Sequence, residues 1–178
     1  MEQDRLITYL TEQIKEAQLK LGFANEAIRL YFPAASLGRM LQWQGGSGKE
    51  LVAALLKESR FTSTRLGTIR FSLCKDDRIE VCIPPEGAVY VRTLPDPPFL
   101  AGWISLFQTN HCLTIEEICA YFASFNPSYS CRKMEQGMDF DYVLYFPDGQ
   151  PDAWYYCIRM ELGHTIYHRF AKEDYEDF

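Results

Sequence analysis

The chain has 178 residues, a formal net charge of −6, 47% hydrophobic residues and 24% charged residues. This composition is typical of folded domains and excludes a disordered chain, a collagen-like chain and a low-complexity linker. Asp and Glu number 24 against 18 Lys and Arg. Because phosphate backbones attract clustered basic residues, we expect no nucleic-acid partner.

The sequence also bears on compartment. Its first residues include Glu2 and Asp4 and lack the basic and apolar regions of a signal peptide. The stretch 99–115 lacks charged residues, but it contains several polar ones and its solidly apolar part ends at Phe107, so we expect no membrane-spanning segment there. The six cysteines form no Cys-x-x-Cys pair. Because no signal peptide supports an oxidising compartment, we expect all six to be reduced thiols. We therefore expect a cytoplasmic protein with no membrane partner and no cofactor.

Helical patterns come first in the chain. Apolar residues recur at helical spacing from Leu6 to Leu21, and Gly22 is a typical helix end. A second short helix is expected between Asn25 and Pro33, and a third over 34–44. Together they predict an N-terminal helical layer over residues 1–46.

The segment from Gly45 to Glu50 is similar to a phosphate-binding loop. However, Trp43 stands where the first glycine of that motif belongs, and Glu50 replaces the hydroxyl residue that would bind Mg²⁺. Ser47 and Glu50 instead fit a capping box. The segment therefore predicts the end of one helix and the start of the next, through 51–56.

A two-residue period follows, and it predicts a hairpin over 69–83. Only one register places Phe71 opposite Val81 and Leu73 opposite Ile79; a shift by one residue would pair apolar with polar side chains. A third strand is expected over Ala88–Arg92. Residues 47–94 then form one unit of a capped helix and three strands.

The rest of the chain, 95–178, predicts a second such unit. A proline-rich break precedes a helix over Phe99–Phe107, and Thr114 with Glu117 forms a capping box for a helix that ends before Pro127. Strands are expected near 129–134, 141–146 and 153–161. Ser47 and Thr114 are 67 residues apart, as are Arg92 and Arg159, so an internal duplication and two unrelated units both remain open.

The predicted fold is a single α+β domain with an N-terminal helical layer and two antiparallel units of one helix followed by three strands. A doubly wound parallel sheet would need a helix between each pair of strands. The pattern has none there.

Glu161, His164 and His168 are the candidate metal ligands. Two histidines four residues apart share one face of a helix or of a strand, so they could bind one metal ion. The zincin arrangement, with Glu next to the first His, is absent. A structural role for these side chains is therefore the favoured interpretation, and a metal-dependent hydrolase is the alternative.

Four carboxylates flank the strand expected near 141–146, namely Asp139, Asp141, Asp148 and Asp152. They could act as an acid and base pair or bind a hard cation. Turn formation beside Gly149 and Pro151 explains Asp148 and Asp152 without any chemistry.

Aromatic residues are dense in the last predicted strands: Tyr142, Tyr145, Phe146, Trp154, Tyr155 and Tyr156. Because one helical layer cannot cover both faces of a sheet, part of this set is expected to form an exposed patch, with Tyr142, Trp154 and Tyr155 as its candidate binding residues. Such a patch suits a protein partner, since Tyr and Trp dominate interface hot spots. Burial in a thick core and base stacking are the alternatives.

Three segments resemble a small uncharacterised bacterial family of unknown function found in gut Firmicutes. They are IKEAQLKLGF, IRLYFPAASL and the C-terminal His-x-x-x-His-Arg-Phe. The resemblance implies a bacterial cytoplasmic setting and carries no catalytic signature. We therefore expect a non-enzymatic protein-binding or regulatory module. A metal-dependent hydrolase using His164 and His168, or a small-molecule sensor domain, are the alternatives.

Overall fold

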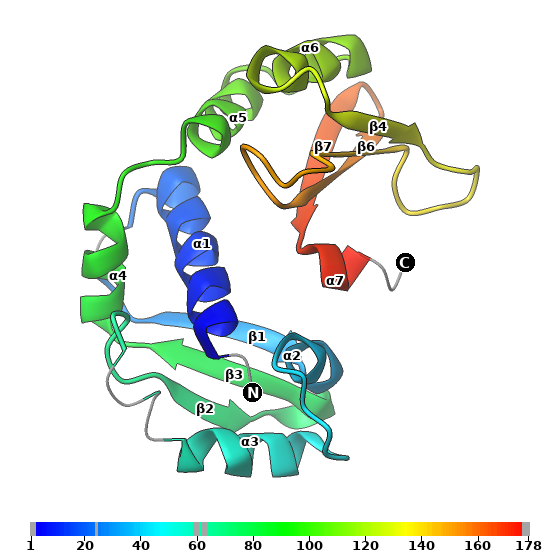
Figure 1. Ribbon diagram of the computed structural model, residues 1–178. Helices are drawn as coiled ribbons and strands as arrows, with labels where there is room; N and C mark the ends of the chain where they lie inside the picture. Colours follow the sequence, from blue (N-terminus) through cyan, green and yellow to red (C-terminus); the bar gives the residue numbers. More distant parts are fainter. Residues whose placement is uncertain (1–2, 24, 59–60, 62–63, 176–178) are drawn as a thin grey trace. The chain divides into compact units, whose positions relative to one another are not determined.

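The computed structural model describes residues 3–23, 25–58, 61 and 64–175. The chain divides into two compact units, Met1–Asp96 and Pro97–Phe178. Each unit combines helices with one antiparallel sheet, of three strands in the first unit and four in the second (Figure 1). The α+β class predicted from the sequence is therefore confirmed.

The sheet of the first unit has the strand order β1-β3-β2. Its strands are β1 (Ile28–Pro33), β2 (Arg70–Leu73) and β3 (Arg78–Ile83), and the short 3₁₀ turn η2 (Lys75–Asp77) joins the last two. Phe71 pairs with Val81 and Leu73 with Ile79, so the predicted hairpin register is confirmed.

Four helices complete the described part of the first unit: α1 (Gln3–Leu21), α2 (Ala34–Met40), α3 (Gly48–Lys57) and α4 (Pro85–Thr93). Leu6, Leu10 and Ile14 of α1 are fully buried in one core with residues of α2, α3 and the sheet. Gly22, with a φ of +74°, follows the last residue of α1. This left-handed conformation ends helices and favours glycine.

The helix predicted between Asn25 and Pro33 is wrong, because residues 28–33 form the edge strand β1. Ile28, Leu30 and Phe32 alternate with more exposed side chains and pack on the core. Pro33 is tolerated because it is the last residue of an edge strand. The expected helical layer over 1–46 therefore contributes one strand to the first sheet.

The strand predicted over Ala88–Arg92 is also wrong, because these residues belong to α4. Pro85 occupies the first turn of that helix, where its missing N–H costs nothing. The first unit is thus not a helix followed by three strands. Arg92 lies in a helix whereas Arg159 lies in a strand, so the 67-residue offset relates unlike elements.

The second unit begins with α5 (Pro98–Thr109) and α6 (Ile115–Phe125). The four-stranded sheet follows in the order β4-β5-β6-β7. Its strands are β4 (Ser130–Lys133), β5 (Tyr142–Tyr145), β6 (Tyr155–Glu161) and β7 (His164–Phe170), and the short helix α7 (Lys172–Tyr175) comes last. The three predicted strands are confirmed, and β7 is an additional one.

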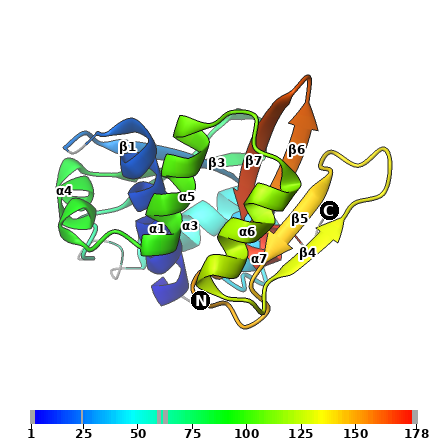
Figure 2. The ribbon, with the colours of Figure 1, turned by 90° about the horizontal axis from the view of Figure 1, so that it is seen from above.

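Helices α5 and α6 cover one face of this sheet (Figure 2). The Tyr156 ring of β6 lies 4.9 Å from the Trp103 ring of α5 and 5.5 Å from the Phe122 ring of α6. Helix α7 lies on the opposite side, where the Tyr155 ring is 4.7 Å from the Tyr175 ring. We call the side that faces α5 and α6 the helix face and the other side the outer face.

Candidate functional site

The predicted binding residues can form one surface only if they lie on the same face of the second sheet. Side chains alternate between the faces of a strand, and directly paired residues share a face. The strand pairing therefore assigns these residues to the outer face: Arg132, Val143, Tyr145, Tyr155, Cys157, Arg159, Glu161, His164, Ile166, His168 and Phe170.

The three aromatic residues predicted to form one patch do not lie together. Tyr142 is half-buried and pairs with Ile158, which places it on the helix face. Trp154 is only 4% exposed, and the Arg169 guanidinium lies 4.2 Å from its ring centre. Only Tyr155 is on the outer face, where it is half-buried. The predicted patch is therefore split between the two sides of the sheet.

A different set of aromatic residues clusters on the outer face. The Tyr155 ring lies 4.4 Å from the Tyr145 ring and 4.7 Å from the Tyr175 ring. Arg132 of β4 donates a hydrogen bond to the Tyr175 hydroxyl, and its guanidinium lies 6.0 Å from that ring centre. Side chains alternate along a strand, so Tyr145 shares a face with Val143. This alternation could have predicted from the sequence that Tyr145 lies beside Tyr155. No local pattern could have placed Tyr175 there.

A second group combines two residues of β7 with Phe140, which comes shortly before β5 in the chain. The Phe140 ring is 5.8 Å from the Phe170 ring and 5.4 Å from the His168 ring. Phe140 and Phe170 are half-buried, whereas His168 is exposed. The outer face thus has an aromatic floor with polar and charged side chains around it.

Among the described residues that the strand pairing assigns to the outer face, Arg132 and Arg159 are cationic and Glu161 is anionic. Arg132 and Arg159 are exposed, and the imidazoles of His164 and His168 are exposed as well. Arg159 forms an ion pair with Glu161 at 3.1 Å, and both side chains are about half exposed. The face therefore offers partly neutralised arginine charge in an otherwise acidic chain.

Cys157 lies between these groups and is fully buried. Burial raises the pKa of the Cys157 thiol to about 12. The thiol is the form present at neutral pH, and thiols are poor nucleophiles compared with thiolates. Cys157 is therefore a packing residue of the sheet.

The candidate metal ligands lie along the β6–β7 hairpin. Glu161 is paired with His164 at the end of the hairpin, whereas His168 is paired with Cys157. Residues four apart on a strand are separated by about 13 Å. Among the described residues, no group of three or more His, Cys, Asp or Glu side chains is placed to hold a metal ion.

The candidate carboxylates support the backbone and are not grouped. Asp141 accepts a hydrogen bond from the Met160 amide at 2.6 Å, and Asp148 accepts one from the Gln150 amide at 3.0 Å. Asp152 accepts from the Trp154 amide at 2.9 Å and pairs with Arg169 at 3.0 Å. These contacts account for three of the four residues. The fourth, Asp139, is exposed.

The glycine-rich segment of the first unit forms a capping box, as predicted. Ser47 accepts a hydrogen bond from the Glu50 amide, and the Glu50 carboxylate accepts from the Ser47 and Gly46 amides at 3.0 and 3.2 Å. These backbone hydrogen bonds lower the pKa of Glu50. A phosphate group here would have to displace a carboxylate from the amides, which disfavours a phosphate-binding role.

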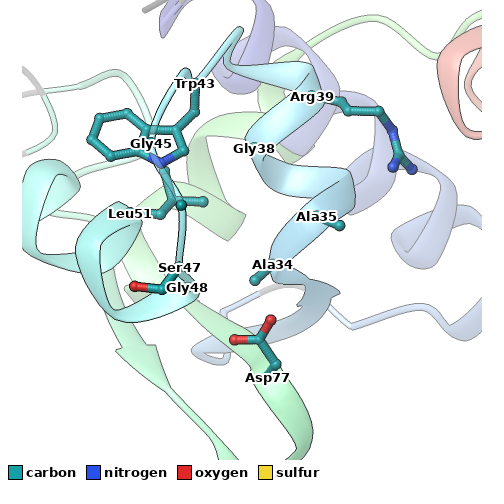
Figure 3. A pocket seen from close by; sticks show the side chains of 11 residues that line it. Ala34, Ala35, Gly38, Arg39, Trp43, Gly45, Ser47, Gly48, Leu51 and Asp77 are labelled. Carbon is teal, nitrogen blue, oxygen red and sulfur yellow. The ribbon is translucent and has the colours of Figure 1, made fainter.

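A cavity of about 300 Å³ adjoins this segment, between α2, residues 43–48 and the turn before β3 (Figure 3). Most of its lining consists of alanine and glycine, with Trp43, Arg39 and Asp77 among the larger side chains. Asp77 lies so close to Gly48 that a Cβ atom there would overlap its carboxylate. This close contact explains why residue 48 is glycine. The Asp77 carboxylate also places a negative charge at the cavity wall.

Comparison with protein families assigns the chain to a class of bacterial domains without a known activity. Residues 3–178 match the family described as "Domain of unknown function, E. rectale Gene description (DUF3877)", and the chain belongs to this family. No curated protein and no solved structure matches the chain. Within the described residues, no helix is long and apolar enough to cross a membrane.

Proposed function

We propose that the chain is a non-enzymatic binding module and that the outer face of its second sheet binds an acidic segment of a partner protein. The observation that carries this proposal is the cluster of Tyr145, Tyr155 and Tyr175 beside the exposed Arg132. Tyrosine and arginine are the residues most often found at interface hot spots, together with tryptophan.

The environment of these residues suits protein recognition. The tyrosines are half-buried and held by one another, so little side-chain entropy is lost when a partner packs on them. Arg132 lies beside the cluster, whereas Arg159, His168 and His164 lie on the same face along β6 and β7 toward the turn between them, and Glu161 is already paired with Arg159. Among the described side chains of this face, a partner carboxylate would therefore meet mainly hydrogen-bond donors.

Neither alternative function has comparable support. A metal-dependent hydrolase needs converging ligands, and Glu161, His164 and His168 are spread along a hairpin. A small-molecule sensor needs a pocket with apolar walls and a few directed polar groups. The cavity beside Gly48 is lined mainly by alanine and glycine, so it offers little side-chain surface for such a ligand.

A peptide library displayed on phage tests the proposal, with the full-length chain as the target. We expect recovered peptides to be enriched in Asp and Glu. Arg132→Glu combined with Arg159→Glu should abolish their binding. The matched control combines Arg78→Glu with Arg92→Glu, two exposed arginines of the first unit, and should retain it. Recovery without acidic enrichment, or equal binding to both double variants, would contradict the proposal.

A further inference from the structure

Two cysteines of the second unit lie on elements that face each other, Cys119 in α6 and Cys131 in β4. Cys131 is paired with Leu144, and Leu144 is paired with Tyr156. Directly paired residues share a face of a sheet, and the Tyr156 ring lies 5.5 Å from the Phe122 ring of α6. Cys131 therefore lies on the helix face, on the side of the sheet that α6 covers (Figure 2).

Helix α6 carries Cys119 on the flank that faces away from α5. Tyr121 and Phe125 face α5, because their rings lie 5.3 and 5.2 Å from the Phe99 ring. Since each residue turns the helix by about 100°, Cys119 is on the opposite flank. Helix α5 contacts β7 at one edge of the sheet, and β4 forms the other edge. The flank with Cys119 therefore lies toward β4.

The thiols of Cys119 and Cys131 are in contact. The Cys119 side chain is hydrogen-bonded both to the Cys131 thiol and to the Tyr129 hydroxyl. Tyr129 directly precedes β4, and its ring lies 5.9 Å from the Phe122 ring, so the start of β4 is held against α6. Cys119 is half-buried and Cys131 is exposed. A small solute can therefore reach two thiols that already contact each other.

The two sulfurs are not equivalent. Desolvation and the hydrogen bond with Cys119 raise the pKa of the Cys131 thiol to about 12. Cys131 therefore keeps its proton at neutral pH, and a protonated thiol is a poor nucleophile. We expect Cys119 to be the sulfur of the pair that reacts first with an oxidant, with Cys131 as the second reactant.

We propose that Cys119 and Cys131 are a redox pair that forms an intramolecular disulfide when hydrogen peroxide oxidises the protein. The Cys119 sulfur attacks one peroxide oxygen and breaks the O–O bond, which gives a sulfenic acid on Cys119 and one water molecule. The Cys131 sulfur then attacks the Cys119 sulfur, and its proton leaves with the displaced hydroxide as a second water molecule. Two thiols are thus oxidised to one disulfide while one peroxide is reduced to two water molecules.

The surroundings of the pair favour this reaction. The contact between the sulfurs offsets the protonated state of Cys131, because reactants that are held together react faster. Disulfides of cytoplasmic proteins are mostly transient and redox-sensing, which suits a pair that a thiol reductant can open again. The inference does not depend on the proposed binding function.

The disulfide would join the edge strand β4 to α6. β4 has four residues and pairs with β5 in the described sheet. A disulfide closes a loop and restricts the unfolded chain, so it stabilises the folded unit. Oxidation would therefore hold the strand that also carries Arg132 of the outer face.

Peptide mapping tests the pair. The folded full-length protein is treated with stoichiometric hydrogen peroxide, its remaining thiols are alkylated, and the digest is analysed by mass spectrometry without reductant. We expect one disulfide-linked peptide pair that joins Cys119 to Cys131 and disappears with dithiothreitol. Cys131→Ser should abolish it, whereas Cys112→Ser, which removes another exposed thiol of the same unit, should retain it. No linked peptide, or a linkage that involves Cys112 or a second copy, would overturn the proposal.

Thermal unfolding tests the consequence for β4. The oxidised and reduced proteins are compared by tryptophan fluorescence in a Trp43→Phe background, after catalase has removed the peroxide. We expect the Tm of the second unit to rise by about 5 °C or more on oxidation. The same treatment should leave the Tm of Cys131→Ser unchanged. A linked pair with an equal or lower Tm would overturn the inference that the disulfide holds β4 against α6.

Discussion

The second unit contains a buried ion pair between Arg169 and Asp152. The side chains of Arg169 and Asp152 are 3% and 8% exposed, and their charged groups are 3.0 Å apart. Arg169 also donates to the Tyr156 hydroxyl at 3.0 Å and stacks on Trp154. Because guanidinium cannot lose its charge at accessible pH, its partners must remain in place.

Removing one partner of this pair should therefore be costly. We expect Asp152→Asn to destabilise the second unit by about 3 kcal/mol, since it leaves a buried cation without its counterion. Urea unfolding monitored by tryptophan fluorescence measures the change. Glu161→Gln breaks the half-exposed pair with Arg159 and should cost no more than about 0.5 kcal/mol. Similar losses of unfolding free energy in both variants would show that the burial of an ion pair does not determine how much its removal destabilises the protein.

At the scale of elements, the starts of two helices were predictable because their signals are local. Ser47 with Glu50, and Thr114 with Glu117, form the capping boxes that begin α3 and α6. Each box depends on four consecutive residues, so no distant contact can override it easily.

Ser47→Ala should lower the stability of the first unit by about 1 kcal/mol, because the Glu50 amide loses its side-chain acceptor. Thr8→Ala is the control, since Thr8 is an exposed residue inside α1 and alanine is the better helix former. Chemical denaturation followed by circular dichroism compares the two. An unchanged midpoint in Ser47→Ala would mean that water replaces the cap without loss.

The elements that the sequence did not reveal depend on contacts far along the chain. β1 is a strand because Ile28, Leu30 and Phe32 pair with β3, some fifty residues later. α4 is a helix because Pro85 begins it and Ala88 and Val91 are buried. A short apolar run fits either structure, and only its partners decide between them.

The same limit applies to the candidate site. The density of aromatic residues predicted rings on both faces of the last strands, yet the choice of Tyr142, Trp154 and Tyr155 as one patch ignored their alternation. Strand parity separates Tyr155 from Tyr142, and it joins Tyr155 to Tyr145. The position of Tyr175 follows from the return of α7 to the sheet, which no pattern in the sequence specifies.

At the scale of the whole molecule, each unit has a core of its own. The core of the first unit is mainly aliphatic and includes Leu6, Leu37 and Val81. Rings dominate the core of the second, where Phe99 contacts Trp103, Phe122 and Phe146. Lys15 donates to the Leu94 carbonyl and to Asp96, both at 2.7 Å, which fixes the chain where the first unit ends.

The two cores should respond differently to alkaline pH. Burial raises the pKa of Cys157 and of Tyr121 to about 12, from ordinary values of 9.0 and 10.0, and both residues belong to the second unit. Above pH 9 the unfolded chain releases protons that the folded unit still holds. Stability that is complete below the ordinary pKa is therefore lost as pH rises toward 12.

We expect the Tm of the second unit to fall by roughly 5 °C or more between pH 8.5 and 10.5, with a smaller decrease in Cys157→Ala. Fluorescence of Trp103 and Trp154 follows this unit, and variants that retain only Trp43 follow the first. Cys112→Ala, which removes an exposed thiol, should leave the pH dependence unchanged. If Cys157→Ala has the same slope as the unmodified chain, the buried thiol is not the group that links alkaline pH to unfolding.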